Sequence, residues 1–523
     1  MIQNSTVFLL VFIFTLFSEE TFGKANDPPK NPFLANDIVS TVHGSSFAQQ
    51  SSPLKGPVFG AKTKIDYLHL GSPGFPLLSR PYPDGKKVVW ISTQSAIVKV
   101  DIEGDKSKII HQIQKPHRLN ISKTKLNLFN LLYRFLPPKF LGTLLQNFVP
   151  NMQEVRHDGG YVVLDKDNKL YFADRRHFIV VYGDRNPLDS NSKIKQLHEF
   201  QIPHHLISLK DKESINGINL TYDGKIVFLT THGLVGIINR EFKHFKYLRL
   251  INEKASNSIS VDEKGGIYVI TDKKMHRIQW TGTKLSQDEK DGAWSANYHT
   301  GGQSTDIRLG NGSGSTPTLM GTDEKNSFVV ITDGASPMNL VLFWRNKIPD
   351  NWKKFPGSPD RRIAGMIPVT FGKNDGKAYQ SEQSVLVNGY KAFVVSNTLQ
   401  MKMSKYPPVN VALSGHPKVK PTGAELFEWN LKNRTLVSKW SHPTVSFPNT
   451  IPTMSRPSNL IYGVGRRKNY WTIETLDWKT GKLNSSFPIG KGLEYNSVYM
   501  ATSLFPNETI IYGSSGGMVK INN

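Results

Sequence analysis

The stretch SNSISVDEKGGIYVITDKKMHRIQW, from Ser256 to Trp280, decides the predicted fold. It has the pattern of a strand, a Gly-Gly turn, a second strand, a short polar loop and a third strand. Similar strand-turn-strand cores recur along the chain and begin at Gly85, Asp167, Asp223, Lys264, Lys325, Gly389, Ser458 and Asn507. Short antiparallel strands repeated in this way are typical of a β-propeller. We therefore predict an all-β fold, an eight-bladed β-propeller of four-stranded antiparallel blades over residues 65–523. A pair of β-sandwiches is the alternative.

The end of the chain indicates how the ring closes. The last repeat stops at Asn523, directly after its third strand. A closed ring then needs its fourth strand from the N-terminal segment, and we expect residues near Ile38 to Val42 to supply it. The remainder of residues 24–64 is expected to be an extended leader.

The N-terminus carries an apolar run, Val7 to Phe17, that is too short to cross a bilayer comfortably. Its length and position fit the core of a secretory signal, with small residues nearby at Thr21 and Gly23. We predict a signal peptide over residues 1–23, with an uncleaved anchor as the alternative. The chain has no cysteine, which in an exported protein favours a bacterial envelope. We therefore expect a secreted or periplasmic protein.

The chain is basic, with a formal net charge of +23. In an exported protein this charge favours anionic lipid, cell-wall polymer or acidic glycan as partner, and not nucleic acid. The positive residues are spread along the chain, so many of them are also expected to do no more than solvate surface strands.

The repeat shape and the phrase GSGSTPTLMGTDEKNSFVVITDG, which starts at Gly312, carry a family resemblance. In this phrase a Ser-Thr-Pro start leads an inner strand into a hairpin. Over residues 65–523 the chain resembles the quinoprotein alcohol dehydrogenase-like propellers, also called pyrroloquinoline-quinone-like repeat proteins. The resemblance implies the eight-bladed fold, and it implies a quinone-dependent dehydrogenase as one alternative function. The tryptophan docking motif and the adjacent-cysteine disulfide of the quinone enzymes are not visible in this sequence.

In a propeller, the loops between second and third strands and the entries to the inner strands gather on one face, where ligand sites form. One candidate set on these loops is rich in oxygen ligands, which suit calcium. Its members are Asn257, Asp272, Asp333 and Glu382. The alternative, which we favour, is that an Asp in a turn caps its own backbone.

A second candidate set on the same loops is basic. Paired arginines at loop tips suit carboxylate, sulfate or phosphate groups through bidentate hydrogen bonds, although a solvated rim is the alternative. The members are Arg175, Arg176, Lys273, Arg466 and Arg467.

His232, in LTTHGLVGI, is a candidate general base or metal ligand, and Glu382 is the second candidate catalytic residue. A single histidine without an identified partner is more simply a structural residue. Neither residue identifies a reaction.

Residues 122–149 interrupt the β pattern between the first and second repeats. Ser122 can cap a helix in which Leu128, Leu131, Leu132 and Phe135 follow helical spacing; Pro137 and Pro138 end it, and a second helix is expected from Phe140 to Phe148. We expect this pair to project over the funnel face. It could form a lid over an apolar ligand, lie on a membrane through Lys123, Lys125, Arg134 and Lys139, or simply pack on the propeller.

The combined prediction is an exported, monomeric propeller that binds a small-molecule or anionic polymer ligand at its central funnel, without evident catalysis. The alternative is an enzyme, either a quinone-dependent dehydrogenase or a metal-assisted hydrolase or lactonase. Calcium is the first cofactor candidate and pyrroloquinoline quinone the second. Peripheral membrane contact through the helical insertion is one of the alternatives for partners.

Overall fold

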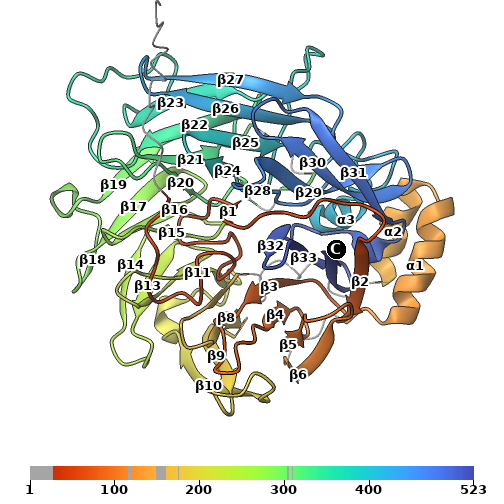
Figure 1. The fold of residues 1–523 in the computed structure, drawn as a ribbon. Helices are drawn as coiled ribbons and strands as arrows, with labels where there is room; N and C mark the ends of the chain where they lie inside the picture. The colour runs from red at the N-terminus through yellow and green to blue at the C-terminus, as the bar shows by residue number, and fades with distance from the viewer. Residues whose placement is uncertain (1–26, 116–119, 149–160, 175, 303–305, 309) are drawn as a thin grey trace, which may run out of the picture.

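The computed structural model describes residues 27–115, 120–148, 161–174, 176–302, 306–308 and 310–523 (Figure 1). The predicted signal peptide and Arg175 lie outside these residues. The described strands form eight sheets that follow one another around a single axis, which confirms the eight-bladed propeller.

Each blade is an antiparallel sheet, and most of its strands follow one another along the chain. Blade 1 contains β3 (Gly74–Leu78), β4 (Val89–Thr93), β5 (Ala96–Asp101) and β6 (Lys108–Gln114), and blade 2 contains β7 (Val162–Leu164), β8 (Leu170–Asp174), β9 (Phe178–Asp184) and β10 (Ile194–Gln201). Blade 3 contains β11 (Ile215–Leu220), β12 (Ile226–Thr230), β13 (Leu234–Ile238) and β14 (Lys246–Arg249). Blade 4 contains β15 (Ser260–Val261), β16 (Gly266–Ile270), β17 (Lys274–Trp280), β18 (Leu285–Ser286) and β19 (Trp294–Asn297). Blade 5 contains β20 (Thr318–Met320), β21 (Phe328–Thr332), β22 (Asn339–Trp344) and β23 (Ile363–Pro368), and blade 6 contains β24 (Leu386–Asn388), β25 (Lys391–Val395), β26 (Ala424–Asn430) and β27 (Thr435–His442). Blade 7 contains β28 (Thr453–Ser455), β29 (Leu460–Arg467), β30 (Tyr470–Asp477) and β31 (Leu483–Gly490). Blade 8 contains β32 (Ser503–Phe505), β33 (Thr509–Ser514), β34 (Gly517–Asn522) and β2 (Lys64–His69).

The core lies between neighbouring blades. Every residue of β16 is buried, because the blades on both sides cover that sheet, whereas most residues of the outer strand β6 are at least partly exposed. This explains why the second and third strands are nearly continuous apolar runs, which sequence patterns detect, while the outer strands are amphipathic and harder to recognise.

The ring closes through β2, which pairs with β34 from Lys64↔Asn522 to His69↔Gly517. An N-terminal strand therefore completes blade 8, but the predicted position, Ile38 to Val42, is wrong. Residues Lys64–His69 suit an outer strand because Ile65 and Tyr67 pack against the core between blades 7 and 8. Residues 38–42 are instead held inside the ring.

Residues 38–52 of the leader fill the hub of the propeller, whereas several residues from 53 to 64 are exposed. The leader passes the inner strands, red in Figure 1, and its short strand β1 (Ser51–Ser52) runs parallel to β28. Its carbonyl groups accept hydrogen bonds of 2.9 to 3.1 Å from inner-strand N–H groups of six blades. The pairs are Val39–Leu78, Ser40–Leu164, Ser46–Val261, Phe47–Leu319, Gln49–Val387 and Gln50–Met454. The leader thereby satisfies backbone groups that would otherwise be buried without partners.

The insertion forms two helices, α1 (Lys123–Phe135) and α2 (Pro138–Phe148), as expected. The Ser122 hydroxyl accepts a hydrogen bond from the backbone N–H of Lys125 and caps α1. The second helix begins two residues earlier than predicted. Within the described residues, no helix is both long enough and apolar enough to cross a membrane.

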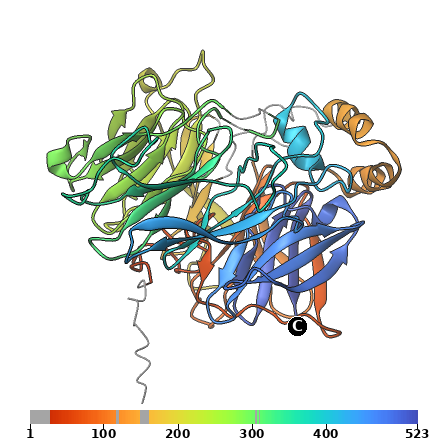
Figure 2. The same cartoon turned by 90° about the horizontal axis from the view of Figure 1, so that it is seen from above.

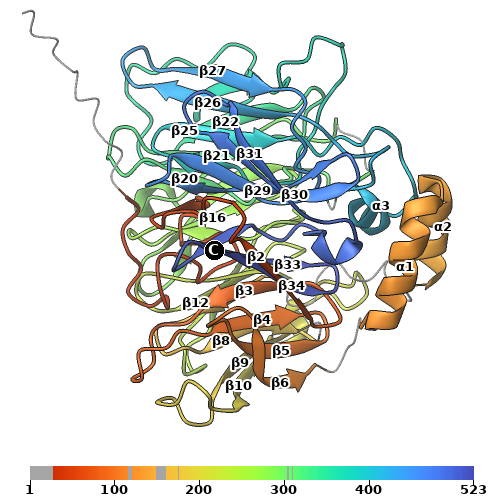
Figure 3. The same ribbon diagram turned by 45° about the vertical axis from the view of Figure 1, so that its right-hand side comes forward.

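The helices lie at the edge of the ring, beside α3 (Pro407–Leu413) and the short helix η3 (Leu493–Tyr495), and not above the central axis (Figure 3). Their inner sides share one apolar cluster with α3, as the packing alternative predicted. In Figure 2 they rise above one face of the ring, whereas the leader begins at the opposite face. Leu128, Leu131 and Phe135 of the predicted apolar pattern face outward, whereas Leu132 packs against the inner cluster.

Candidate functional site

The loops of blades 3 and 4 form an open groove with a volume of about 740 Å³. It brings together three of the predicted site residues: His232 from the β12–β13 loop, and Asp272 and Lys273 from the β16–β17 loop. His205 and Lys254, which the sequence did not single out, also line it. They belong to connections between blades, whose paths the strand pattern does not reveal. We call this site the rim groove.

One end of the rim groove is built on a partly buried ion pair between Arg249 and Glu213. Arg249 Nη1 lies 2.9 Å from Glu213 Oε1 and also donates a 2.9 Å hydrogen bond to the carbonyl of His232. Glu213 accepts further hydrogen bonds from the Thr230 hydroxyl at 2.5 Å and from the Ser208 N–H at 2.9 Å. The arrangement fixes the loop that carries His232.

The other acidic residues of the rim groove are also engaged by the protein. Glu253 lies 2.8 Å from His276 Nε2 and accepts a 2.5 Å hydrogen bond from the Thr271 hydroxyl. Burial opposes ionisation of Glu253, but His276 and Thr271 outweigh it and lower the pKa of the Glu253 carboxyl. Asp272 accepts a 2.8 Å hydrogen bond from the backbone N–H of Lys254.

The basic groups of the rim groove have fewer partners within the protein than its acidic groups. The ammonium groups of Lys254 and Lys273 are exposed and form no ion pair within the described part of the chain. His232 keeps Nδ1 within 3.1 Å of the Thr231 hydroxyl, which leaves Nε2 for another partner. The groove therefore offers cationic and donor groups to a ligand with carboxylate, sulfate or phosphate oxygens.

The predicted calcium ligands do not assemble. Asn257 donates a 2.7 Å hydrogen bond to the Ser313 carbonyl, and Asp333 accepts hydrogen bonds from the side chain and the backbone of Asn339. Glu382 Oε1 lies 3.4 Å from Arg308 Nε. No three acidic or histidine side chains of the described residues are grouped to hold a metal ion. Asp333 caps its own turn, as the alternative predicted.

The predicted basic set is divided among separate places. Lys273 lies in the rim groove, while Arg176 pairs with Asp174 at 2.7 Å and Arg467 pairs with Glu474 at 2.9 Å. Arg466 is buried beneath the helices, with its guanidinium 4.9 Å from the Trp471 ring centroid. Arginine spacing alone does not distinguish these environments, because each depends on which acid the fold brings near.

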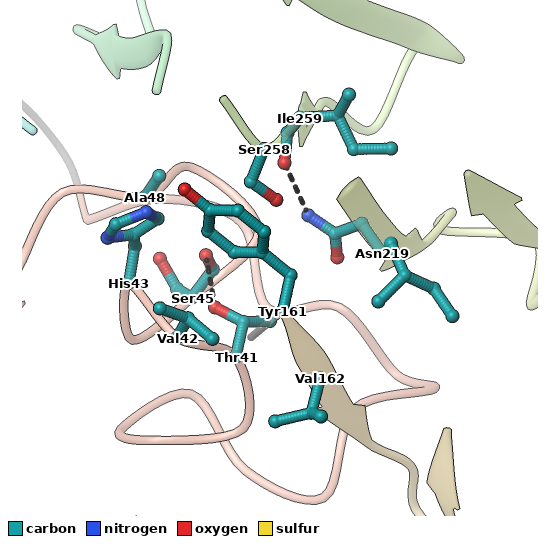
Figure 4. Close-up of a pocket in the computed structure, with 11 residues that line it drawn as sticks. Thr41, Val42, His43, Ser45, Ala48, Tyr161, Val162, Asn219, Ser258 and Ile259 are labelled. Atoms are coloured by element: carbon teal, nitrogen blue, oxygen red, sulfur yellow. Dashed lines mark hydrogen bonds between the residues drawn. The ribbon is translucent and has the colours of Figure 1, made fainter. Parts of the chain in front are cut away.

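The hub contains a small polar cavity between the leader and blades 2 to 4 (Figure 4). The ring of Tyr161 lies between His43 and Ser258, and Asn219 donates a 3.0 Å hydrogen bond to the Ile259 carbonyl. The cavity volume is about 10 Å³, which is room for one water molecule and not for an organic ligand. His43 Nε2 lies 3.1 Å from the Thr316 hydroxyl, whereas its Nδ1 has no partner within the described residues.

Comparisons with known proteins support the propeller fold and identify a relative in sequence. No protein-family model matches the chain. A quinohemoprotein alcohol dehydrogenase from Comamonas testosteroni has a similar structure, with a TM-score of 0.52 and 11% identity over 93% of this chain and 80% of that one; this likeness supports the propeller fold alone. The computationally designed Ika8 protein gives a TM-score of 0.46 at 9% identity, over 88% of this chain and 99% of that one.

A relative at the level of sequence comes from Archaeoglobus fulgidus. It is an uncharacterized protein that is 37% identical over 514 residues, which cover 95% of this chain and 90% of the relative. Identity of this extent over nearly the whole propeller goes beyond a shared fold. The chain therefore belongs to the same family as this Archaeoglobus fulgidus protein.

Proposed function

We propose that this propeller is a binding protein that takes an anionic ligand in the rim groove of blades 3 and 4. The observation that carries the proposal is the asymmetry of the groove's charges. Glu213 is paired with Arg249, Glu253 lies against His276, and Asp272 accepts a backbone hydrogen bond. Lys254 and Lys273 form no ion pair within the described residues.

The groove suits an extended ligand better than a compact one. It is open, its volume is about 740 Å³, and its cationic groups come from two separate loops. The exposed side chain of Ile251 adds an apolar contact at its edge. An acidic glycan or another polymer with repeated carboxylate, sulfate or phosphate groups matches these features.

The proposal places the ligand on the rim and not on the axis. The leader fills the hub on one side, and Arg308 lies against Glu382 where the predicted funnel would be. The likeness to quinoprotein propellers supplies the framework only. No catalytic role is part of the proposal, because His232 has no acidic partner within the described residues and Glu382 is held by an arginine.

The test is direct binding of polygalacturonate, dextran sulfate and polyphosphate, each labelled with a fluorophore, to the full-length protein. The double variant Lys254→Glu/Lys273→Glu is expected to weaken the best of these probes at least tenfold. Lys353→Glu/Lys354→Glu is the matched control, because it changes the net charge equally at two exposed lysines without ion pairs within the described residues. An equal loss in both variants would show that only the overall positive charge attracts polyanions, and the proposal would fail.

A further inference from the structure

Beneath the helical insertion, a buried guanidinium lacks an acidic partner among the described residues. Arg466 stands near the end of β29, and only 3% of it is exposed. Its Nε and Nη1 atoms have no hydrogen-bond partner within the described part of the chain, and no carboxylate there forms an ion pair with it. A charge removed from water in this way is costly unless something compensates it.

Helix α1 brings a second unsatisfied donor to the same place. The hydroxyl group of Tyr133 is buried and has no partner among the described residues. Burial raises the pKa of Tyr133, while the positive charge of Arg466 acts in the opposite direction, so the two groups lie within electrostatic reach. Tyr133 is therefore a protonated phenol whose O–H is available to an acceptor.

The segment after α3 contributes two more basic side chains. His416 lies against Tyr133, with ring centroids 5.2 Å apart and nearly perpendicular rings. Its Nδ1 accepts a hydrogen bond from the Lys418 N–H, which assigns the ring proton to Nε2. Burial and the charges of Arg466 and Lys418 hold the pKa of His416 at about 4, so the neutral ring offers one N–H donor. Lys420 donates its ammonium to the carbonyl of Arg466 at 2.9 Å.

The framework behind these groups is close-packed. The Arg466 guanidinium lies over the indole of Trp471, which fixes the plane of its hydrogen-bonding edge. Gly415 allows the loop that carries His416 to lie on the same indole, because a Cβ at this position would come within 2.0 Å of a Trp471 ring carbon. The donors are thus held in place before any ligand binds, which lowers the entropy lost on binding.

We propose that Tyr133, His416, Lys420 and Arg466 form a second anion-binding site, the covered site, for a small phosphate, sulfate or carboxylate group. The unpartnered groups named above are all donors, and Arg466 and Lys420 each carry a positive charge. The guanidinium can bind two oxygens of one anion, while the tyrosine hydroxyl and the histidine N–H can bind the others. The site lies beneath α1, on the other side of the ring from the rim groove, and it does not depend on the function proposed for that groove (Figure 1).

The experiment is isothermal titration calorimetry of the full-length protein with inorganic phosphate, sulfate and acetate, at constant ionic strength set with potassium chloride. At least one oxyanion is expected to bind with a stoichiometry of one at the covered site. Tyr133→Phe removes one donor to a charged ligand and should weaken binding about tenfold or more. Arg466→Met should abolish it.

Two variants serve as controls and should keep the wild-type affinity. Arg467→Gln removes the neighbouring guanidinium, which forms an ion pair with Glu474, and Lys353→Glu/Lys354→Glu alters two exposed lysines outside both proposed sites. If Arg466→Met fails to fold, Tyr133→Phe decides the matter, because it deletes a single unpaired hydroxyl. The proposal is overturned if no oxyanion binds the wild-type protein beyond the effect of chloride, or if Tyr133→Phe and Arg466→Met bind as tightly as the wild type.

Discussion

Lys99 of blade 1 and Asp184 of blade 2 form an ion pair from which water is almost excluded. The distance from Lys99 Nζ to Asp184 Oδ1 is 2.6 Å, and the side chains are 0% and 2% exposed. Tyr82 donates a further 2.6 Å hydrogen bond to Asp184, and the Lys99 ammonium lies 4.7 Å from the Tyr82 ring centroid. The pair ties two neighbouring blades together through their outer halves.

Breaking this pair from one side is expected to destabilise the protein strongly. Lys99→Met or Asp184→Asn alone should lower the free energy of unfolding by about 3–5 kcal/mol, because each leaves one buried charge without its partner. The double variant Lys99→Met/Asp184→Asn should lose less than either single variant, since it leaves no charge and keeps an acceptor for Tyr82. Chemical denaturation measures all three. Additive losses would contradict the coupling.

A substitution at Phe47 tests whether the leader is part of the hydrophobic core. Its side chain is 0% exposed, packs in the cluster between blades 4 and 5, and lies 5.0 Å from the Arg345 guanidinium. Phe47→Ala should lower the free energy of unfolding by about 3–5 kcal/mol, because it opens a cavity at the hub. Val58→Ala, in the same leader at a side chain that is 71% exposed, should change it by less than about 0.5 kcal/mol. Equal effects would show that the leader does not hold the hub.

The buried side chain of His43 is expected to make the free energy of unfolding depend on pH. Burial lowers its pKa from 6.5 to about 4 in the folded protein. Below pH 6.5 the unfolded chain binds this proton and the folded protein does not, so stability falls as the pH drops towards 4. The loss from this group between pH 7 and pH 4 is about 3 kcal/mol.

Carboxyl groups also titrate in this range, so the informative quantity is the difference between wild type and His43→Gln, in which the residue no longer titrates. The unfolding free energy of the variant should depend less on pH by about 3 kcal/mol over this interval. Parallel pH profiles for the two proteins would exclude His43 as the cause.

The outward side of α1 is expected to bind anionic membranes. Leu131 and Phe135 are 55% and 77% exposed, residues 120–148 contain four basic residues and no acidic residue, and the inner side is already packed. Leu131→Ser/Phe135→Ser should reduce sedimentation with phosphatidylserine vesicles at least tenfold, because apolar contacts and charge attraction act together. Val58→Ser/Leu188→Ser removes two comparably exposed apolar side chains and should have no effect. Binding that is unchanged in the first variant, or lost equally in both, would contradict a membrane role for this face.

The candidate sites show how far loop positions can be predicted from strand repeats. The repeat alone places His232, Asp272 and Lys273 on one face, and they meet in the rim groove. The repeat also placed Arg466 on a loop of this face, but it is buried in β29, and the repeat did not single out Lys254. Whether a lysine or arginine is free or paired depends on acids from distant segments, as the Arg467–Glu474 and Arg176–Asp174 pairs demonstrate.

The sequence by itself determined the all-β class, the number of blades, the position of the helical insertion and the need for an N-terminal strand to close the ring. These follow from local regularities: strand alternation, turn residues and helix capping each act over a few neighbouring residues. Only the tertiary structure decided that Lys64–His69 closes the ring, that residues 38–52 fill the hub, and that Leu128, Leu131 and Phe135 of α1 face outward. Each of these depends on which surfaces remain uncovered after the eight blades have assembled. Burial of those surfaces is a property of the whole ring, and no short stretch of sequence encodes it.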